Sequence, residues 1–305
     1  ATTTPVQPDR PEATRRSWSR AVDDIREGVQ DRELWSHLAW QDIKQRYRRS
    51  ILGPLWITLS MGVTAIGLGL LYSQLFGAQI GTFLPYLTVG FIVWGFVIGC
   101  MTEGADTFIQ NEGLIKHLPA PLSVYALRTV YRLTIMFGHN LIVYFIVLAV
   151  FFTDLSRPYQ IVEAPEGGFE LWQPGLSWAA LLAIPAFVLL VINGAWVTLL
   201  FGIISTRFRD IPQLIAALSS LMFFMTPIVW SADILYVKFG EEADWRWLVT
   251  DLNPLYHFIE LLRAPMIGNQ QAWTHWAVVG GFTIVGWGAT LLAMRNYRSR
   301  VSYWV

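Results

Sequence analysis

The chain is poor in charged residues. Of its 305 residues, 14% are charged and 54% are hydrophobic, whereas a soluble domain carries about 25% charged residues. The 22 basic and 22 acidic side chains cancel, which excludes a nucleic-acid binder that relies on net positive charge. Only one cysteine is present, Cys100. This excludes an intrachain disulfide framework and a cysteine-ligated zinc site.

Motifs for catalysis are also lacking. There is no GxxxxGK[ST] phosphate-binding loop, so the chain does not hydrolyse ATP by that route. No HExxH motif or cluster of cysteine and histidine ligands occurs either. We therefore expect a chain that is not an enzyme and that binds no metal or cofactor of its own.

The positions of the missing charges indicate a membrane protein. Asp, Glu, Lys and Arg are all absent from five stretches: 50–102, 133–153, 171–206, 211–232 and 264–294. About 20 apolar residues span the ~30 Å hydrocarbon core of a bilayer, so the first stretch suffices for two helices with a break at 77–81. The sequence predicts an all-α polytopic protein with six transmembrane helices near 51–76, 84–102, 125–152, 177–204, 212–230 and 273–294.

Basic residues fix the predicted orientation. Six spans put both termini on one side, together with the segments 103–132 and 205–210. That side carries eighteen Lys and Arg residues and the other side carries four. By the positive-inside rule, both termini face the cytoplasm. The first fifty residues contain no apolar core of a signal peptide, so we expect none to be cleaved.

The first fifty residues divide into two parts. Residues 1–30 are rich in Pro, Thr, Arg and Asp, which predicts a disordered cytoplasmic arm. Residues 31–50 predict an amphipathic helix on the membrane surface, or alternatively a plain basic anchor for the first span. Apolar side chains recur there every four residues: Trp35, Ala39, Ile43 and Tyr47. The transmembrane domain then occupies residues 51–305.

Three segments between the spans are informative. In 103–124, residues 111–118 predict a short helix that Pro119 stops, either a docking element for a soluble partner or a solvated turn. The external segment 153–176 is acidic and rich in Pro and Gly, which predicts irregular structure. After Asn253 and a following proline, the sequence predicts a short capped helix that re-enters the outer leaflet or packs on the spans.

Five motifs, in this order, resemble the permease subunit of ABC-2 type exporters of polysaccharides such as O-antigen, capsule and teichoic acid. They are QRYRRSILGPLW at 45–56, LPAPL at 118–122, RFRDI at 207–211, MTPI at 225–228 and NPLY at 253–256. The resemblance extends over residues 31–300. The long insert 153–176 departs from the family pattern. The chain has nineteen Arg residues and three Lys residues. This excess of arginine and the long insert together favour an actinobacterial galactan exporter within the family.

The resemblance implies a set of partners. Two copies of the chain would form a homodimer in the lipids of the cytoplasmic membrane and bind two copies of a separate ABC ATPase subunit, which holds ATP and magnesium. The substrate would be a polyprenyl-diphosphate-linked glycan that passes through a pore between the protomers. The segment 103–124 would couple the permease to the ATPase, and the short helices before the last span would form an outer gate.

Candidate site residues follow from this mechanism. Arg46, Arg48 and Arg49 would bind the lipid diphosphate, because guanidinium groups match phosphate oxygens. Aromatic rings would line the pore: Tyr72, Phe91, Trp94, Phe223, Phe224 and Trp230. Residues of the short helix would contact the ATPase: Asn111, Glu112, Leu114, Lys116 and His117.

Other functions stay open at this stage. An ABC-2 exporter of lipids or small molecules would share the fold. A membrane-embedded glycan transferase is the enzymatic alternative, but such enzymes usually carry an acidic, metal-binding first external loop, and 77–83 contains no charge. A channel without an ATPase is the third alternative.

Overall fold

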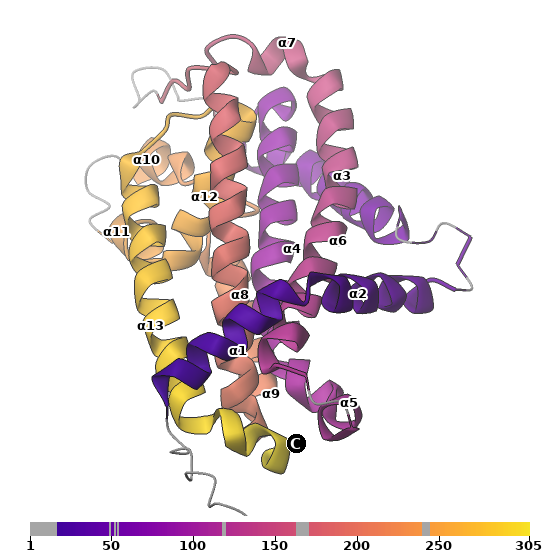
Figure 1. The fold of residues 1–305 in the computed structure, drawn as a ribbon. Coiled ribbons are helices and arrows are strands. Elements are labelled where there is room, and N and C mark those ends of the chain that lie inside the picture. The colour runs from indigo at the N-terminus through magenta and orange to yellow at the C-terminus, as the bar shows by residue number, and fades with distance from the viewer. Residues whose placement is uncertain are drawn as a thin grey trace, which may run out of the picture.

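The computed structural model describes residues 17–48, 50–51, 53, 55–117, 120–162, 171–239 and 245–305. In these residues the fold is helical, with two isolated β-bridges and no strand, as Figure 1 shows. The elements are α1 Trp18–Gln30, α2 Arg32–Arg46, α3 Leu55–Phe76, α4 Ile80–Gln110, α5 Glu112–His117, α6 Leu122–Val150, α7 Phe152–Leu155, the 3₁₀ helix η1 Trp178–Leu182, α8 Ala183–Arg207, α9 Ile211–Met225, α10 Asp233–Phe239, α11 Arg246–Val249, α12 Pro254–Ile267 and α13 Trp273–Trp304.

Five of the six predicted spans correspond to helices that are long and apolar enough to cross a membrane. They lie in α3, α4, α6, η1 with α8, and α13. The sixth, α9, is apolar but shorter than the predicted segment 212–230. Its 15 residues extend about 22 Å. The helix ends because Thr226 precedes a proline and adopts an extended conformation, which the proline ring favours.

Helix α4 forms the centre of the bundle. It packs against α3, α6, α8, α9 and α12, and 78% of its most apolar window is buried. Glycine permits the closest approaches between helices: a Cβ atom at Gly104 would lie 2.9 Å from the Cα atom of Thr198 on α8. On α13, a Cβ atom at Gly286 would collide with the ring of Trp196. Both helices thus contact α8 through positions that only glycine fits.

The helices extend beyond the apolar segments that predicted them. The predicted span 84–102 is part of α4, which continues to Gln110, and the last span continues to Trp304. Most of the predicted loop 103–124 is therefore helical, because α4, α5 and α6 occupy all but a few of its residues. The short helix predicted at 111–118 is confirmed as α5, which ends at His117.

The prediction of a disordered arm at 1–30 is wrong for its second half. Residues 18–30 form α1, and residues 1–16 lie outside the described part of the chain. A helix is present in the predicted segment 31–50 as α2, which ends at Arg46, and Ala39 and Ile43 of the predicted apolar stripe are buried. The prediction that this helix is amphipathic is wrong, because its apolar residues are spread around its surface and Trp40 is exposed. Its position on the membrane surface stays a prediction. Figure 1 shows α1 and α2 running across the long helices, towards the end of the bundle where α5 lies.

A buried carboxylate explains the order of α1. Asp24 is 1% exposed, and its oxygens accept from the backbone N–H groups of Leu122 (3.2 Å) and Ser123 (3.1 Å), in the first turn of α6. The same carboxylate accepts from Nε of Arg298 on α13 at 2.7 Å. Asp24 therefore caps α6 from another helix and satisfies amides that the helix itself leaves unpaired.

We predict that Asp24→Ala destabilises the protein by about 2 kcal/mol, because it removes a helix cap and leaves Arg298 without its partner. This corresponds to a Tm roughly 5 °C lower in thermal unfolding of the detergent-solubilised chain. The matched control is Asp23→Ala, since Asp23 is the exposed neighbour. Equal Tm values for the two variants would contradict the capping role.

Candidate functional site

A network of ion pairs joins the predicted interface helix to the bundle. The carboxylate of Asp42 on α2 accepts from Arg128 on α6 through Nε (2.7 Å) and Nη2 (2.5 Å). It also accepts from Nη1 of Arg132 at 2.9 Å. Arg132 in turn donates to Glu103 of α4 at 2.6 Å. These four largely buried side chains hold α2, α4 and α6 together, and bidentate arginine pairs are the strongest of this kind.

The charge of Asp42 is stabilised by its partners. Burial alone would raise the pKa of this carboxyl, but the guanidinium groups of Arg128 and Arg132 more than offset burial and hold the pKa below its ordinary value of 3.8. Asp42 is therefore ionised at neutral pH, and α2 stays attached by charge as well as by its buried side chains Ala39 and Ile43.

The same network reaches α5. Nη1 of Arg128 donates to Oδ1 of Asn111 at 2.8 Å, and Nδ2 of Asn111 donates to the carbonyl of Thr107 at 2.7 Å. Asn111 lies between α4 and α5, so Arg128 connects the start of α5 to Asp42. Through Asn111, α5 is thus linked by side-chain hydrogen bonds to the residue that anchors α2.

The other predicted coupling residues lie on the outside of the molecule. No residue of α5 is buried; Glu112 and Lys116 form an exposed ion pair at 2.5 Å, and Leu114 is 38% exposed. His117 is also exposed. Asn111 differs from them because its side chain is part of the ion network. The helix therefore presents a free surface, as a docking element would.

The predicted diphosphate residues lie at the end of α2. Arg46 is the last residue of the helix; its side chain is 48% exposed and lies 3.9 Å from Glu103. Arg48 follows in an exposed turn. Arg49 lies outside the described residues.

The structure brings five of the six predicted pore aromatics together at the contact of α4 and α9. The ring of Phe223 lies 6.0 Å from Phe91, 5.7 Å from Trp94 and 5.2 Å from Phe224, measured between centroids. The indole of Trp230 donates to the carbonyl of Phe224 at 3.1 Å. The sixth, Tyr72 on α3, packs against the same hydrophobic core.

Part of this aromatic group lines a surface cavity of about 360 Å³, which we call the α4–α9 groove. Its walls combine rings with hydroxyl groups and small side chains. They are Trp94, Ile98, Thr102, Ala216, Ser219, Ser220, Phe223 and Phe224. The ring of Phe224 is 67% exposed. Apolar ring faces beside hydroxyl groups can contact both the C–H faces and the hydroxyls of a sugar.

A buried arginine supports the irregular chain after α9. Arg263 on α12 is completely buried; its Nη2 donates to the carbonyl of Pro227 at 2.8 Å and its guanidinium lies 3.7 Å from the ring centroid of Tyr86 on α4. Glu260 pairs with Arg263, and the hydroxyl of Tyr86 donates to the same carbonyl of Pro227 at 3.1 Å. These contacts satisfy backbone that has left the helix, which non-helical chain inside a membrane protein requires.

Helix α12 confirms the predicted capped helix before the last span. Oδ1 of Asn253 accepts from the backbone N–H of Leu255 at 3.0 Å, and every residue from His257 to Ile267 is buried. The helix packs on α4, α8 and α13. Of the two placements that the sequence left open, packing on the spans is observed.

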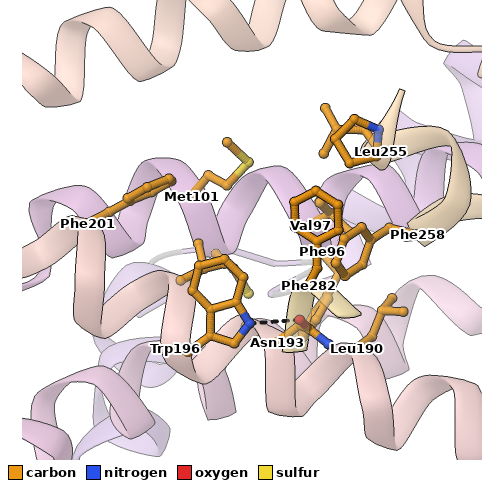
Figure 2. A pocket seen from close by; sticks show the side chains of 14 residues that line it. Phe96, Val97, Met101, Leu190, Asn193, Trp196, Phe201, Leu255, Phe258 and Phe282 are labelled. Atoms are coloured by element: carbon orange, nitrogen blue, oxygen red, sulfur yellow. Dashed lines mark hydrogen bonds between the residues drawn. The ribbon is translucent and has the colours of Figure 1, made fainter. Parts of the chain in front are cut away.

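Figure 2 shows an apolar pocket of about 190 Å³ among α4, α8, α12 and α13. Its lining includes Phe96, Met101, Leu190, Leu255 and Phe282. The amide of Asn193 also lines it, but its Oδ1 already accepts from the indole of Trp196 at 2.7 Å, the dashed line in the figure. The pocket suits an apolar chain and offers no unpaired polar group for a headgroup.

The sequence pattern of the ABC-2 type transporter family matches residues 33–267. The chain belongs to this family. It is 27% identical over 220 residues, 72% of this chain and 74% of the relative, to the O-antigen export system permease protein RfbA of Klebsiella pneumoniae. It is 24% identical over 232 residues, 76% of this chain and 79% of the relative, to the protein of the same name from Myxococcus xanthus.

The matched segment begins in α2 and ends with α12. In this ABC-2 chain, the Asp42 network, α5, the α4–α9 groove and Arg263 all lie inside the match, whereas Asp24 and Arg298 lie outside it. Two groups of buried charges were not predicted from the sequence: the Asp42 network, and the pair of Glu260 and Arg263. The available signals were Arg128 and Arg132 four residues apart at the start of a span, and Glu260 and Arg263 in an otherwise apolar helix.

We predict that Asp42→Asn lowers the Tm of this ABC-2 subunit at neutral pH and that the difference disappears on acidification. A carboxyl with a depressed pKa stabilises the fold fully above its unfolded value, 3.8, and this contribution is lost as the pH falls through the lower folded value. Thermal unfolding of both proteins at a series of pH values from 7 downwards measures it. Glu33→Gln, an exposed change on the same helix, is the control. A Tm difference that stays constant below pH 3.8 would disprove the electrostatic role.

Proposed function

We propose that two copies of this chain form the membrane part of an ATP-driven exporter that moves a polyprenyl-diphosphate-linked polysaccharide out across the cytoplasmic membrane. The observation that carries the proposal is the similarity, over about three quarters of the chain, to permease proteins of O-antigen export systems. The α4–α9 groove adds chemical support, because the exposed ring of Phe224 and the hydroxyls beside it suit a sugar polymer.

A separate ATPase subunit supplies the energy in this proposal. The sequence has no phosphate-binding loop, and α5 has a surface that the chain itself leaves uncovered. Two ATPase subunits, with ATP and magnesium, would dock on the two copies of α5. Their movement would pass through Asn111 and Arg128 to Asp42 and α2.

The substrate would be engaged from the cytoplasmic side. With both termini inside, α2 lies at the cytoplasmic surface, and Arg46, Arg48 and Arg49 at its end would bind the diphosphate at headgroup level. A long polymer is too large to be enclosed, so it would thread between the two protomers. Stacking on aromatic rings tolerates changes of register and would let the chain slide.

A second candidate function is export of a lipid or small apolar molecule by the same type of transporter. The pocket in Figure 2 favours it, because 190 Å³ of apolar space among the helices would take part of a hydrocarbon chain. The two functions differ in what accumulates inside cells that lack the chain. Retention of lipid-linked polysaccharide supports the first, and normal export of polysaccharide with retention of a lipid supports the second.

We predict that replacing Arg46, Arg48 and Arg49 together by Gln abolishes polysaccharide export but leaves membrane insertion intact, since the change removes the phosphate ligands without altering the spans. The assay measures lipid-linked polysaccharide retained in the cells of a complemented deletion strain, with the amount of chain in the membrane as a check.

The matched control replaces Arg20, Arg26 and Arg32 by Gln. These three arginines on α1 and α2 are exposed, so their replacement removes the same amount of positive charge from the same side of the molecule. Export at the wild-type level by the Arg46, Arg48 and Arg49 variant would exclude the diphosphate role.

We predict that Leu114→Glu on α5 lowers export at least tenfold and leaves the Tm unchanged within about 1 °C, because surface substitutions alter stability little. Val29→Glu serves as the control, since Val29 is an exposed apolar residue of α1, 56% exposed. If both variants export equally well, α5 is not the coupling surface.

A further inference from the structure

A polar cavity of about 400 Å³ lies at the end of the bundle opposite α5. We call it the α7 cavity, after the short helix at the top of Figure 1. It is formed by the start of α4 and by the described parts, 153–162 and 171–176, of the insert that departs from the family pattern. Its lining residues are Gln79, Thr82, Thr153, Asp154, Arg157, Pro158, Tyr159, Gln160 and Trp172. The volume lies within the range of small-molecule sites, roughly 300–1,000 Å³.

The walls of the α7 cavity are fixed by hydrogen bonds. Tyr159 and Gln173 exchange antiparallel backbone hydrogen bonds of 3.1 and 2.7 Å, which place Trp172 opposite Gln160. The hydroxyl of Tyr159 donates to the carbonyl of Ile267 at the end of α12 at 2.7 Å. The hydroxyl of Thr82 donates to the carbonyl of Gln160 at 3.0 Å. Although the insert is rich in Pro and Gly, this part of it is attached to α4 and α12.

The described lining of the α7 cavity carries one side chain of each charge. Asp154 and Arg157 are both exposed, and neither takes part in an ion pair within the described part of the chain. The glutamates of the same insert, Glu163, Glu166 and Glu170, lie outside the described residues. No group of three or more potential metal ligands occurs in the described residues. The described lining, with its amides, hydroxyls and one charge of each sign, favours a ligand that both donates and accepts hydrogen bonds.

An aromatic surface completes this chemistry. Trp172 is 59% exposed at the cavity wall, beside the amides of Gln79 and Gln160 and the hydroxyl of Thr153. A sugar has hydroxyls that donate and accept together, and C–H faces that pack on an aromatic ring. A carboxylate and a guanidinium can each bind two neighbouring hydroxyls. A sugar therefore matches the combination of an aromatic ring, amides, a hydroxyl and two charged groups in this lining.

We propose that the α7 cavity is an external binding site for the sugar units of the polysaccharide as the polymer leaves the membrane. This inference rests on the proposed function for its biological role. Binding outside the membrane would hold the emerged chain and oppose its return. The polymer would then contact the α4–α9 groove first and the α7 cavity at the outer surface afterwards. There the insert would contribute to the choice of glycan.

The test measures binding of polysaccharide to the purified, full-length chain. The probe is the lipid-linked glycan of membranes from the cells that express the chain, released from its lipid by mild acid. Isothermal titration then gives the Kd of the wild type and of Trp172→Ala, Asp154→Asn and Trp178→Ala. Trp178 is the control because it is 88% exposed, lies on η1 after the insert and does not line the cavity.

We expect Trp172→Ala and Asp154→Asn each to weaken binding about tenfold, the size expected for loss of one good aromatic or charged contact, and Trp178→Ala to leave the Kd unchanged. Absence of binding to the wild type would overturn the site, as would equal affinities of the Trp172→Ala and Trp178→Ala variants. In the last case Trp172 would be only an interfacial anchor in the lipid.

Failure of this proposal is distinguishable from failure of the proposed function. Retention of lipid-linked polysaccharide in cells without the chain is measured separately and does not depend on the α7 cavity. If polysaccharide is retained but the purified chain does not bind the released glycan, export stands and the external site is wrong. If the purified chain binds the glycan through Trp172 but cells that lack the chain retain no lipid-linked polysaccharide, the binding site stands and the export role is wrong.

Discussion

The ion pairs of the Asp42 carboxylate with the guanidinium groups of Arg128 and Arg132 are the interactions on which the α5 end of the molecule depends. They fix α2 across the ends of α4 and α6, and through Asn111 they connect this helix to α5. Without them, α2 would rely on its two buried apolar side chains, Ala39 and Ile43, for its position. The candidate diphosphate residues and the candidate ATPase surface thus share one support, because side-chain hydrogen bonds link α5 to α2.

Arginine also organises the opposite part of the bundle. There Arg263 is buried with Glu260 over the ring of Tyr86, and together they bind the carbonyl of Pro227 where the chain leaves α9. A buried ion pair adds little stability for its own sake. Its effect here is to allow a break in a helix inside the bundle, and this break sets the position of the aromatic rings at the end of α9. The α4–α9 groove depends on that position.

Much of the helical architecture could be predicted from the sequence, because missing charges identify membrane-crossing segments without any knowledge of packing. The cap at Asn253 and the short helix before Pro119 were predictable as well, since their signals are local. The order of α1 was not, because the partners of Asp24 lie 98 and 274 residues away along the chain. The early end of α9 depends on the conformation of one residue before Pro227. Aromatic residue types suggested a group of rings but not which of them meet, because contacts such as that of Phe223 with Phe91 and Trp94 join residues far apart in the chain.

Purification of the chain from its native membrane, through a tag at its N-terminus, tests most directly whether it works as the membrane subunit of a two-component exporter. A tag at the other end would disturb Val305, which is buried. We expect that a separate ATPase subunit co-purifies in an amount equal to that of this chain and that the eluate hydrolyses ATP. A pure oligomer of this chain alone, without ATPase activity, would contradict it.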